Sequence, residues 1–454
     1  MDQNDEQTKQ PTPVAATPTP AGETASGDEP WGWVERCVWT EAMLTRLASS
    51  ESANRIWFTL VDKVFAPANL RCAFDKVWRK GGCAGVDRQS VEHFARHAEE
   101  ELLRLQGQLR DGSYRPQPVR RAWIDKLGTK EKRPLGIPAV RDRIVQAALR
   151  HVMEPIFERD FAVHSYGFRP RRGAKDALRR VARLLEAGYT HVVDADLKAF
   201  FDTIPQKQLL ALLRERVADG RVLALVESFL RVGVLEEGKG WLPTECGTPQ
   251  GGVISPLLAN IYLNRLDHEM AKLGYEMVRY ADDFVILCRS AEEAQRALEA
   301  VRAWVEAAGL HLHPEKTRLV DSTQRGGFDF LGYHFERGRR WPRQKSMQKL
   351  KDQVRAKTAR TEGRSLDAIV KDVNRTLRGW YGYFQHSKAN VFLAVDGFVR
   401  RRLRSLLEKR RGQTRMGLGR AHQRWSNAWF ARAGLVSLEA EHAWTRTIVA
   451  LRTH

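Results

Sequence analysis

The spacing of apolar and polar positions along the chain predicts helices and strands that alternate through its middle. Helical spacing marks most of 31–109 and the segments 141–157, 206–217 and 291–308. Short apolar runs predict strands at 119–125, at 191–197, on both sides of Ala281-Asp282-Asp283, and at 328–335. This mixture predicts an α+β core built on an antiparallel sheet.

Turn-forming residues place two features between these elements. A basic segment, Leu127 to Lys132, separates the first predicted strand from Arg133–Pro138, which predicts a hairpin with a basic tip. Pro249-Gln250-Gly251-Gly252 predicts a loop that leads into a helix. Ser255 is the expected N-cap of that helix, and Pro256 lies in its first turn.

The two ends of the chain differ in composition from its middle. Residues 1–30 are rich in Pro, Thr, Ala and acidic residues, and they are predicted to be disordered. They hold six acidic residues and one Lys, a net charge of −5; the whole chain carries +20, so the remainder carries 20 + 5 = +25. Beyond residue 340 the sequence becomes helical, basic and aromatic.

The net charge points to a polyanionic partner. The chain has 75 Lys and Arg against 55 Asp and Glu, an excess that suits nucleic acid or an anionic membrane surface. No apolar run is long enough to span a membrane, and the N-terminus has no features of a targeting peptide. The cysteines are scattered without metal-ligand or redox-motif spacing, which predicts reduced thiols in a bacterial-type cytoplasm: Cys37, Cys72, Cys83, Cys246 and Cys288.

Carboxylates follow two of the predicted strands. Asp194 and Asp196 end an apolar strand and share one face by alternation, so spacing alone does not say which of them binds a metal. Asp282 and Asp283 occupy a tight turn. An Asp pair in a turn is ordinarily solvated, but polymerising nucleotides needs carboxylates from different strands that hold two Mg²⁺ ions. A Gly-rich loop between the two segments and a basic chain favour the second interpretation.

Nine motifs, in order over about residues 66–440, resemble those of group II intron-encoded reverse transcriptases, also called maturases. They are Cys83–Asp87, Lys132–Pro138, Ser165–Pro170 with Gly173, Asp196–Asp202, Gly247–Gly252 with Ser255-Pro256, Tyr280–Asp283, Pro314–Thr317, Phe330–Tyr333 and Arg378–Phe384. The resemblance implies a right-hand polymerase fold, with fingers and palm made of an antiparallel sheet plus helices, followed by an α-helical thumb or maturase (X) domain.

The resemblance also implies a division of the chain. The implied segments are a disordered acidic extension (1–30), a helical extension with the start of the fingers (31–118), the fingers and palm (119–338), the thumb/maturase domain (339–412) and a basic, DNA-binding-like C-terminal region (413–454). No Cys pairs or His-Asn-His pattern follow, so the resemblance is to the type without an HNH endonuclease domain.

The resemblance assigns roles around the acidic hairpin. Asp196, Asp282 and Asp283 are the implied ligands of two Mg²⁺ ions, and Lys316 protonates or neutralises the leaving pyrophosphate. Phe201 is placed to block a ribose 2′-hydroxyl, which implies dNTP substrates, while Phe200 is expected in the core. Further implied substrate contacts come from two loops: Lys126, Arg133, Gln250 and Gly251.

The basic, aromatic region after residue 340 is expected to hold nucleic acid through phosphates. The candidate residues in this region are Arg378, Trp380, Arg400 and Arg401, and Arg169 of the earlier Ser165–Pro170 motif is a further candidate. Trp380 is also expected to pack in the helical core. Implied partners are a structured intron RNA, an RNA template/DNA primer duplex, a DNA target and dNTPs, with no membrane; the oligomeric state stays open.

The function implied is an RNA-directed DNA polymerase that copies a group II intron RNA and binds it as a maturase in splicing and retromobility. Two alternatives remain open at this point. One is a domesticated reverse transcriptase in defence or repair. The other is a non-catalytic RNA-binding splicing factor, against which the intact carboxylates and Phe201 argue.

Overall fold

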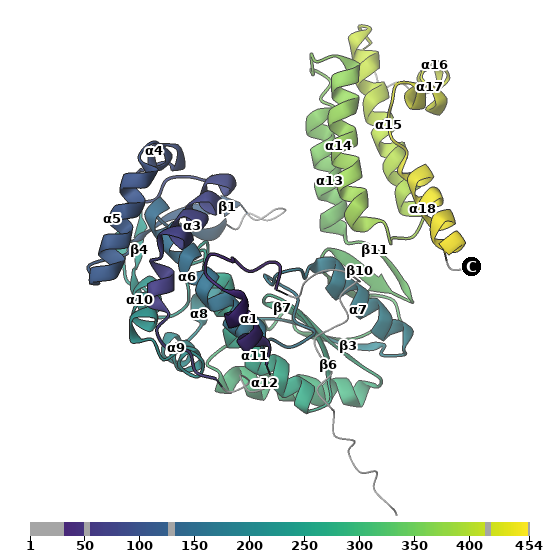
Figure 1. The fold of residues 1–454 in the computed structure, drawn as a ribbon. Helices are drawn as coiled ribbons and strands as arrows, with labels where there is room; N and C mark the ends of the chain where they lie inside the picture. Colours follow the sequence, from purple (N-terminus) through teal and green to yellow (C-terminus); the bar gives the residue numbers. More distant parts are fainter. Residues whose placement is uncertain (1–30, 50–54, 126–131, 414–418, 453–454) are drawn as a thin grey trace, which may run out of the picture.

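The computed structural model describes residues 31–49, 55–125, 132–413 and 419–452. The disordered extension predicted at 1–30 and the basic hairpin tip lie outside them. Helices at the start and end of the chain frame a central region of strands and helices (Figure 1). The α+β class is confirmed. None of the helices in these residues is long and apolar enough to cross a membrane.

A four-stranded antiparallel sheet forms the centre of the molecule, in the order β6-β7-β3-β8. Its strands are β3 (His191–Asp196), β6 (Glu276–Tyr280), β7 (Asp283–Cys288) and β8 (Arg318–Asp321). Alternate residues of β3 and β7 enter two different apolar clusters: Val193 and Ile286 join the large core, and Val192 and Val285 join the cluster of α7. Both faces of this sheet are therefore buried.

Helices cover the two faces. The large core contains residues of α11 (Ser255–Lys272) and α12 (Ala291–Ala307), while α7 (Ala174–Glu186) covers the other face. The large core continues into helices of the first part of the chain. These are α1 (Glu41–Ala48), α2 (Val61–Val64), α3 (Pro67–Lys80), α4 (Val91–Arg96), α5 (Ala98–Asp111), α6 (Val140–Glu158), α8 (Phe200–Thr203), α9 (Gln206–Arg214) and α10 (Gly220–Arg231).

A second sheet has the order β2-β1-β4-β5. Its strands are β1 (Val119–Asp125), β2 (Lys132–Ile137), β4 (Val234–Glu236) and β5 (Gly240–Leu242). β1 and β2 pair antiparallel, with Asp125 opposite Lys132, so the predicted pairing of these segments is confirmed.

The prediction of a single strand over 328–335 is wrong, because this segment forms a hairpin of two strands. β9 (Phe328–Phe330) and β10 (Tyr333–Glu336) pair antiparallel, and β11 (Arg339–Pro342) completes a three-stranded sheet. Leu331 and Gly332 have φ values of 47° and 85° and turn the chain between the strands. The apolar run continues through this turn, so it reads as one strand.

A separate helical body follows the last sheet and stands beside the central sheet (Figure 1). It comprises α13 (Gln344–Lys357), α14 (Leu366–Phe384), α15 (Asn390–Arg410), α16 (Arg420–Arg424), α17 (Asn427–Arg432) and α18 (Leu438–Arg452). It has its own apolar core, which includes Leu350, Val373 and Leu403. Amphipathic spacing explains this packing, since each long helix turns one apolar stripe inward.

Candidate active site

Three carboxylates meet where the inner strands β3 and β7 of the central sheet end, a place called the acidic edge below. Asp196, the last residue of β3, lies opposite Asp283, the first residue of β7. Tyr280 and Asp283 form the closing pair of the β6–β7 hairpin, so Ala281 and Asp282 make its two-residue turn. The hairpin predicted around Ala281-Asp282-Asp283 is thus confirmed, and Ala281 adopts a left-handed φ of 60°.

A buried arginine holds this turn in place. Arg279 of β6 is fully buried, and its Nε donates to Asp267 Oδ1 of α11 at 2.7 Å. Its Nη1 donates to the Ala281 carbonyl at 2.9 Å and to Asn260 Oδ1 at 3.0 Å. A buried guanidinium with all these partners fixes both the turn and the helix behind it. The prediction from sequence missed Arg279; its signal is a charged residue at an inward position of an apolar strand.

Gly167 explains why a second segment fits against the same turn. The backbone of 164–166 pairs alongside β6, with Tyr166 N donating to the Arg279 carbonyl at 2.9 Å. A Cβ on Gly167 would lie 2.2 Å from Ala281 N, so only glycine permits this approach. Asn260 Nδ2 donates to the Gly167 carbonyl at 2.8 Å and ties this segment to α11.

Burial and neighbouring negative charges raise the pKa of the two carboxylates of the turn, Asp282 and Asp283. Burial, together with the charges of Asp194, Asp196 and Asp282, raises the pKa of Asp283 to about 7. Burial and the charge of Asp196 also raise the pKa of Asp282. Negative charges so close together repel one another, and a bound divalent cation would relieve that repulsion. The carboxylate oxygens are also the hard ligands that Mg²⁺ prefers.

Two cations face the carboxylates of β3: Lys316, in the turn before β8, and Arg318, the first residue of β8. Lys316 Nζ donates to Asp196 Oδ2 at 2.5 Å, and Arg318 Nε donates to Asp194 Oδ2 at 3.0 Å. Burial raises the pKa of Asp194 despite Arg318. The structure therefore brings Lys316 to the predicted site, and adds Asp194 as a fourth carboxylate beside Asp283.

The glycine-rich loop, Pro249–Gly252, packs against strand β2 of the second sheet. Gly136 N of β2 donates to the Gln250 carbonyl at 2.6 Å. Gly251 has a φ of 111°, and a Cβ there would lie 2.2 Å from the Gly136 carbonyl oxygen. Arg133, on the same strand, is exposed, and its charge partly offsets the rise in the pKa of Asp282. This strand therefore carries a cation whose charge acts on the carboxylates. Lys126 lies outside the described residues.

The helix after this loop begins differently from the prediction. Ser255 is the first helical residue of α11 and not its N-cap, which is Ile254. The Ser255 hydroxyl donates to the Pro249 carbonyl at 2.9 Å and closes the loop instead of capping the helix. The expected N-cap was wrong because the helix begins one residue earlier than expected, which makes Ser255 its first residue.

Phe200 lies in the core as expected, and Phe201 packs against that core. Phe200 is 2% exposed and belongs to the core, while Phe201 is half-buried, with its ring edge-on to Phe200 at 5.5 Å. The Phe201 carbonyl accepts a hydrogen bond from Thr248 N at 2.7 Å, so Phe201 lies beside the glycine-rich loop.

A cleft of about 740 Å³ joins the acidic edge to the helical body. Tyr280 and Asp283 line one side. Residues of α13, α14 and the segment before them line the rest, among them Arg343, Lys349, Arg375, Trp380 and Tyr383. A carboxylate at one end of a basic, aromatic cleft suits a polyanion whose reacting end meets the acidic edge.

Two family models match consecutive parts of the chain: "Reverse transcriptase (RNA-dependent DNA polymerase)" over residues 124–335, and "Group II intron, maturase-specific domain" over 347–429. Protein YkfC of Escherichia coli is 36% identical over 294 residues, which cover 56% of this chain and 76% of that protein. The chain belongs to the group II intron reverse transcriptase/maturase family. It therefore carries a reverse transcriptase domain followed by a maturase-specific domain, and RNA is a partner of such domains.

Two further comparisons cover a smaller share of the matched protein. Group II intron-encoded protein LtrA of Lactococcus lactis is 30% identical over 363 residues, which cover 65% of this chain but only 59% of LtrA. A solved partial Cas6-RT-Cas1–Cas2 complex matches 55% of this chain and 41% of its own chain at 27% identity, with a TM-score of 0.34. Reverse transcriptases generally use divalent metal ions, which agrees with the carboxylate cluster.

The predicted nucleic-acid residues of this maturase have different surroundings. Arg378 and Arg401 are exposed on α14 and α15. Arg400 is half-buried, with Nη1 3.8 Å from Asp396 Oδ2. Trp380 is half-buried against Phe384 and Phe392, yet it also lines the cleft, and its buried Nε1 has no hydrogen-bond partner among the described residues.

Arg169 is the clear departure from these predictions. It is buried, and its Nη2 lies 2.7 Å from Glu158 Oε1. Its Nη1 donates to the carbonyls of Ala162 and Ser165 at 2.6 and 2.8 Å. Protein groups in the interior take up the hydrogen bonds of this guanidinium, so it does not face nucleic acid. Its position in the sequence, next to Pro170 and two further arginines, does not reveal this.

Proposed function

We propose that this chain copies a group II intron RNA into DNA by two-metal nucleotidyl transfer, and that it binds that RNA as a maturase. The observation that carries the proposal is the meeting of Asp196, Asp282 and Asp283 at the sheet edge that opens into the basic cleft. Polymer synthesis needs such an arrangement, because the growing end must reach the metal ligands while its duplex is held elsewhere.

In this proposal the three carboxylates hold two Mg²⁺ ions. When bound, the ions supply the positive charge that activates the primer 3′-hydroxyl and stabilises the leaving pyrophosphate. Asp282 and Asp283 are oriented by the turn that Arg279 fixes, and Asp196 by its register opposite Asp283. Lys316 gives up its contact with Asp196 and neutralises or protonates the pyrophosphate.

The incoming dNTP is proposed to lie between β2 and the carboxylates. Arg133 binds its triphosphate, with Lys126 as a second cation, because guanidinium donors match phosphate oxygens. Gln250 and Gly251 support the nascent base pair from a loop that is tied to β2. Phe201 blocks a ribose 2′-hydroxyl and so selects dNTPs.

The helical body is proposed to hold the RNA template/DNA primer duplex and the structured intron RNA. Arg343, Lys349 and Arg375 line the cleft that Asp283 also lines. Arg378, Arg400 and Arg401 add cations on α14 and α15. Phosphate contacts of this kind read A-form shape and not sequence. A DNA target of retromobility is proposed to bind in the C-terminal region, 413–454.

Primer extension tests the proposal. Purified protein with poly(rA)/oligo(dT), dTTP and Mg²⁺ should extend the primer, and Asp282→Ala should abolish extension while keeping RNA binding. Asp62→Ala, an exposed carboxylate on α2, serves as the matched control and should extend normally. An Asp282→Ala protein that still polymerises would overturn the metal assignment, and an inactive wild-type protein that binds RNA tightly would favour a non-catalytic splicing factor.

A further inference from the structure

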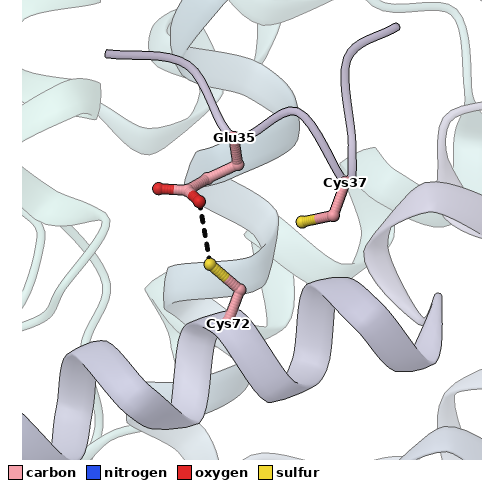
Figure 2. A group of neighbouring side chains, drawn as sticks. All are labelled: Glu35, Cys37 and Cys72. Atoms are coloured by element: carbon pink, nitrogen blue, oxygen red, sulfur yellow. Dashed lines mark hydrogen bonds between the residues drawn. The ribbon is translucent and has the colours of Figure 1, made fainter.

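Three side chains with metal-binding chemistry converge in the first part of the chain, and none of them belongs to the catalytic carboxylates (Figure 2). Glu35 and Cys37 belong to the turn segment before α1, and Cys72 to α3. One ligand atom of each lies within 4.8 Å of the other two. The cysteines are 35 positions apart, which is why the spacing of cysteines along the sequence does not reveal the cluster.

The carboxylate of Glu35 is held toward the thiols. Lys76 lies one helical turn after Cys72 on α3, and its Nζ contacts Glu35 Oε1 at 2.5 Å. The Cys72 thiol donates to the other oxygen, Glu35 Oε2, at 2.8 Å. A hydrogen-bonded partner behind a carboxylate is the arrangement that orients ligands in metal sites.

The turn segment is itself anchored. Trp39 is fully buried, and its Nε1 donates to the His151 carbonyl of α6 at 3.0 Å. Val38 is also buried, whereas Cys37 is exposed. The thiol of Cys37 is therefore held beside Cys72 by its neighbours in the chain and remains open to solvent, so an ion has a route of entry.

The ligand set favours a thiophilic ion. Two of the three ligand atoms are sulfurs, and sulfur ligands select Zn²⁺-like ions over Mg²⁺. The third is a carboxylate oxygen, which Zn²⁺ also accepts.

We propose that Glu35, Cys37 and Cys72 form a binding site for one thiophilic divalent cation of the Zn²⁺ class. Binding replaces the two thiol protons, which leave to solvent, by two metal–thiolate bonds; a Glu35 oxygen is the third ligand, and water fills the fourth position of a tetrahedral ion. No oxidant or reductant takes part. The ion fastens the turn segment to α3, independently of the catalytic carboxylates.

Cd²⁺ titration of the reduced, full-length protein tests this site, with excess Mg²⁺ present to occupy oxygen-ligand sites. Ultraviolet thiolate-to-metal absorbance is the readout, because carboxylates alone cannot produce it. One equivalent should bind per chain. Cys37→Ser and Cys72→Ser should each weaken binding at least about 100-fold, and Lys76→Met by about 10–100-fold, as loss of an orienting partner does. Cys83→Ser, another exposed cysteine, is the matched control and should bind normally.

A second readout does not depend on absorbance. Zn²⁺ should raise the thermal unfolding midpoint of the wild type and of Cys83→Ser but not that of the Cys37→Ser/Cys72→Ser double variant, because an ion that binds only the folded state stabilises it. An absorbance band that survives in the double variant at wild-type affinity would overturn the proposal. So would the absence of any band in reduced wild-type protein that is folded by circular dichroism.

Discussion

Asp283 illustrates how a single side chain can work against the stability of its own fold. Its pKa is raised to about 7 by burial and by three neighbouring carboxylates. The folded state thus holds this proton more tightly than the unfolded chain, so stability is lost as pH rises from about 4 through 7. The carboxylates of this cluster would be stabilised by the positive charge of a bound metal ion, which the chain itself does not provide.

Asp283→Asn should therefore stabilise the metal-free protein at pH 8 and have little such effect near pH 4. The gain is expected on the order of 1 kcal/mol, since one pKa unit corresponds to about 1.4 kcal/mol and partial exposure reduces the effect. Urea unfolding in EDTA at the two pH values measures it. Adding Mg²⁺ should reverse the order at pH 8, and a difference that does not vary with pH would contradict the electrostatic account.

Phe201 carries a prediction on substrate choice. Phe201→Ala should allow incorporation of rNTPs by removing the ring proposed to face the ribose, while dNTP incorporation continues. Primer extension with rNTPs alone measures this. Phe200→Ala is the comparison: a cavity at this buried position should cost about 3–5 kcal/mol of stability and leave sugar selection unchanged. Unaltered discrimination in Phe201→Ala would remove this residue from the dNTP site.

Arg169 and the Cys37–Cys72 pair mark the limit of prediction at the residue scale. Local patterns, a strand end and a turn, could mark the carboxylates as candidates, while the choice of Asp196 over Asp194 came from the family resemblance. The structure brings Asp196 and the turn that holds Asp282 and Asp283 together. Arg169 has a motif that reads as exposed and basic, but its partners are Glu158 and two carbonyls that only the tertiary fold supplies. The roles assigned to Lys126, Arg133, Gln250 and Gly251 stay predictions.

Elements were predicted best where periodicity is strong and uninterrupted. The helix expected over 141–157 is α6, Val140–Glu158, and the helix expected over 291–308 is α12, Ala291–Ala307. The prediction failed where a backbone turn passes through an apolar run, as at Leu331-Gly332. The domain boundaries inside the chain likewise remain predictions, since composition changes gradually across them.

The contact between Gly167 and the β6–β7 turn gives a prediction at the element scale. Gly167→Ala would push a methyl group against Ala281 N, so the turn and its Asp282 must shift. A displacement of about 1 Å can cost about 100-fold in rate, and synthesis should fall by about that factor. Gly107→Ala, where a Cβ meets nothing within 4 Å, should keep full activity. Equal activity of the two variants would show that the turn tolerates the shift.

The whole molecule has a charge distribution that should govern its affinity for RNA. Its net charge beyond residue 30 is +25, and each neutralised phosphate releases counterions. The logarithm of RNA affinity should therefore fall linearly with that of salt concentration. Arg378→Gln and Arg401→Gln should each reduce the slope by about 0.7–0.9, measured by filter binding. Arg169→Gln should lower thermal stability and leave the salt dependence unchanged. A reduced slope with unchanged stability would show that Arg169 contacts RNA.

The buried Arg279 has a consequence for how such a chain would lose its activity over time. Its partners lie on α11 and in the turn, so replacing it would strand Asp267 in the interior and disturb the fold itself. Asp282 has no such structural duty. A descendant that had abandoned copying but still assisted splicing would be free to drift at Asp282 long before Arg279. Variation at these two positions, compared across relatives, would separate working polymerases from those that have become scaffolds.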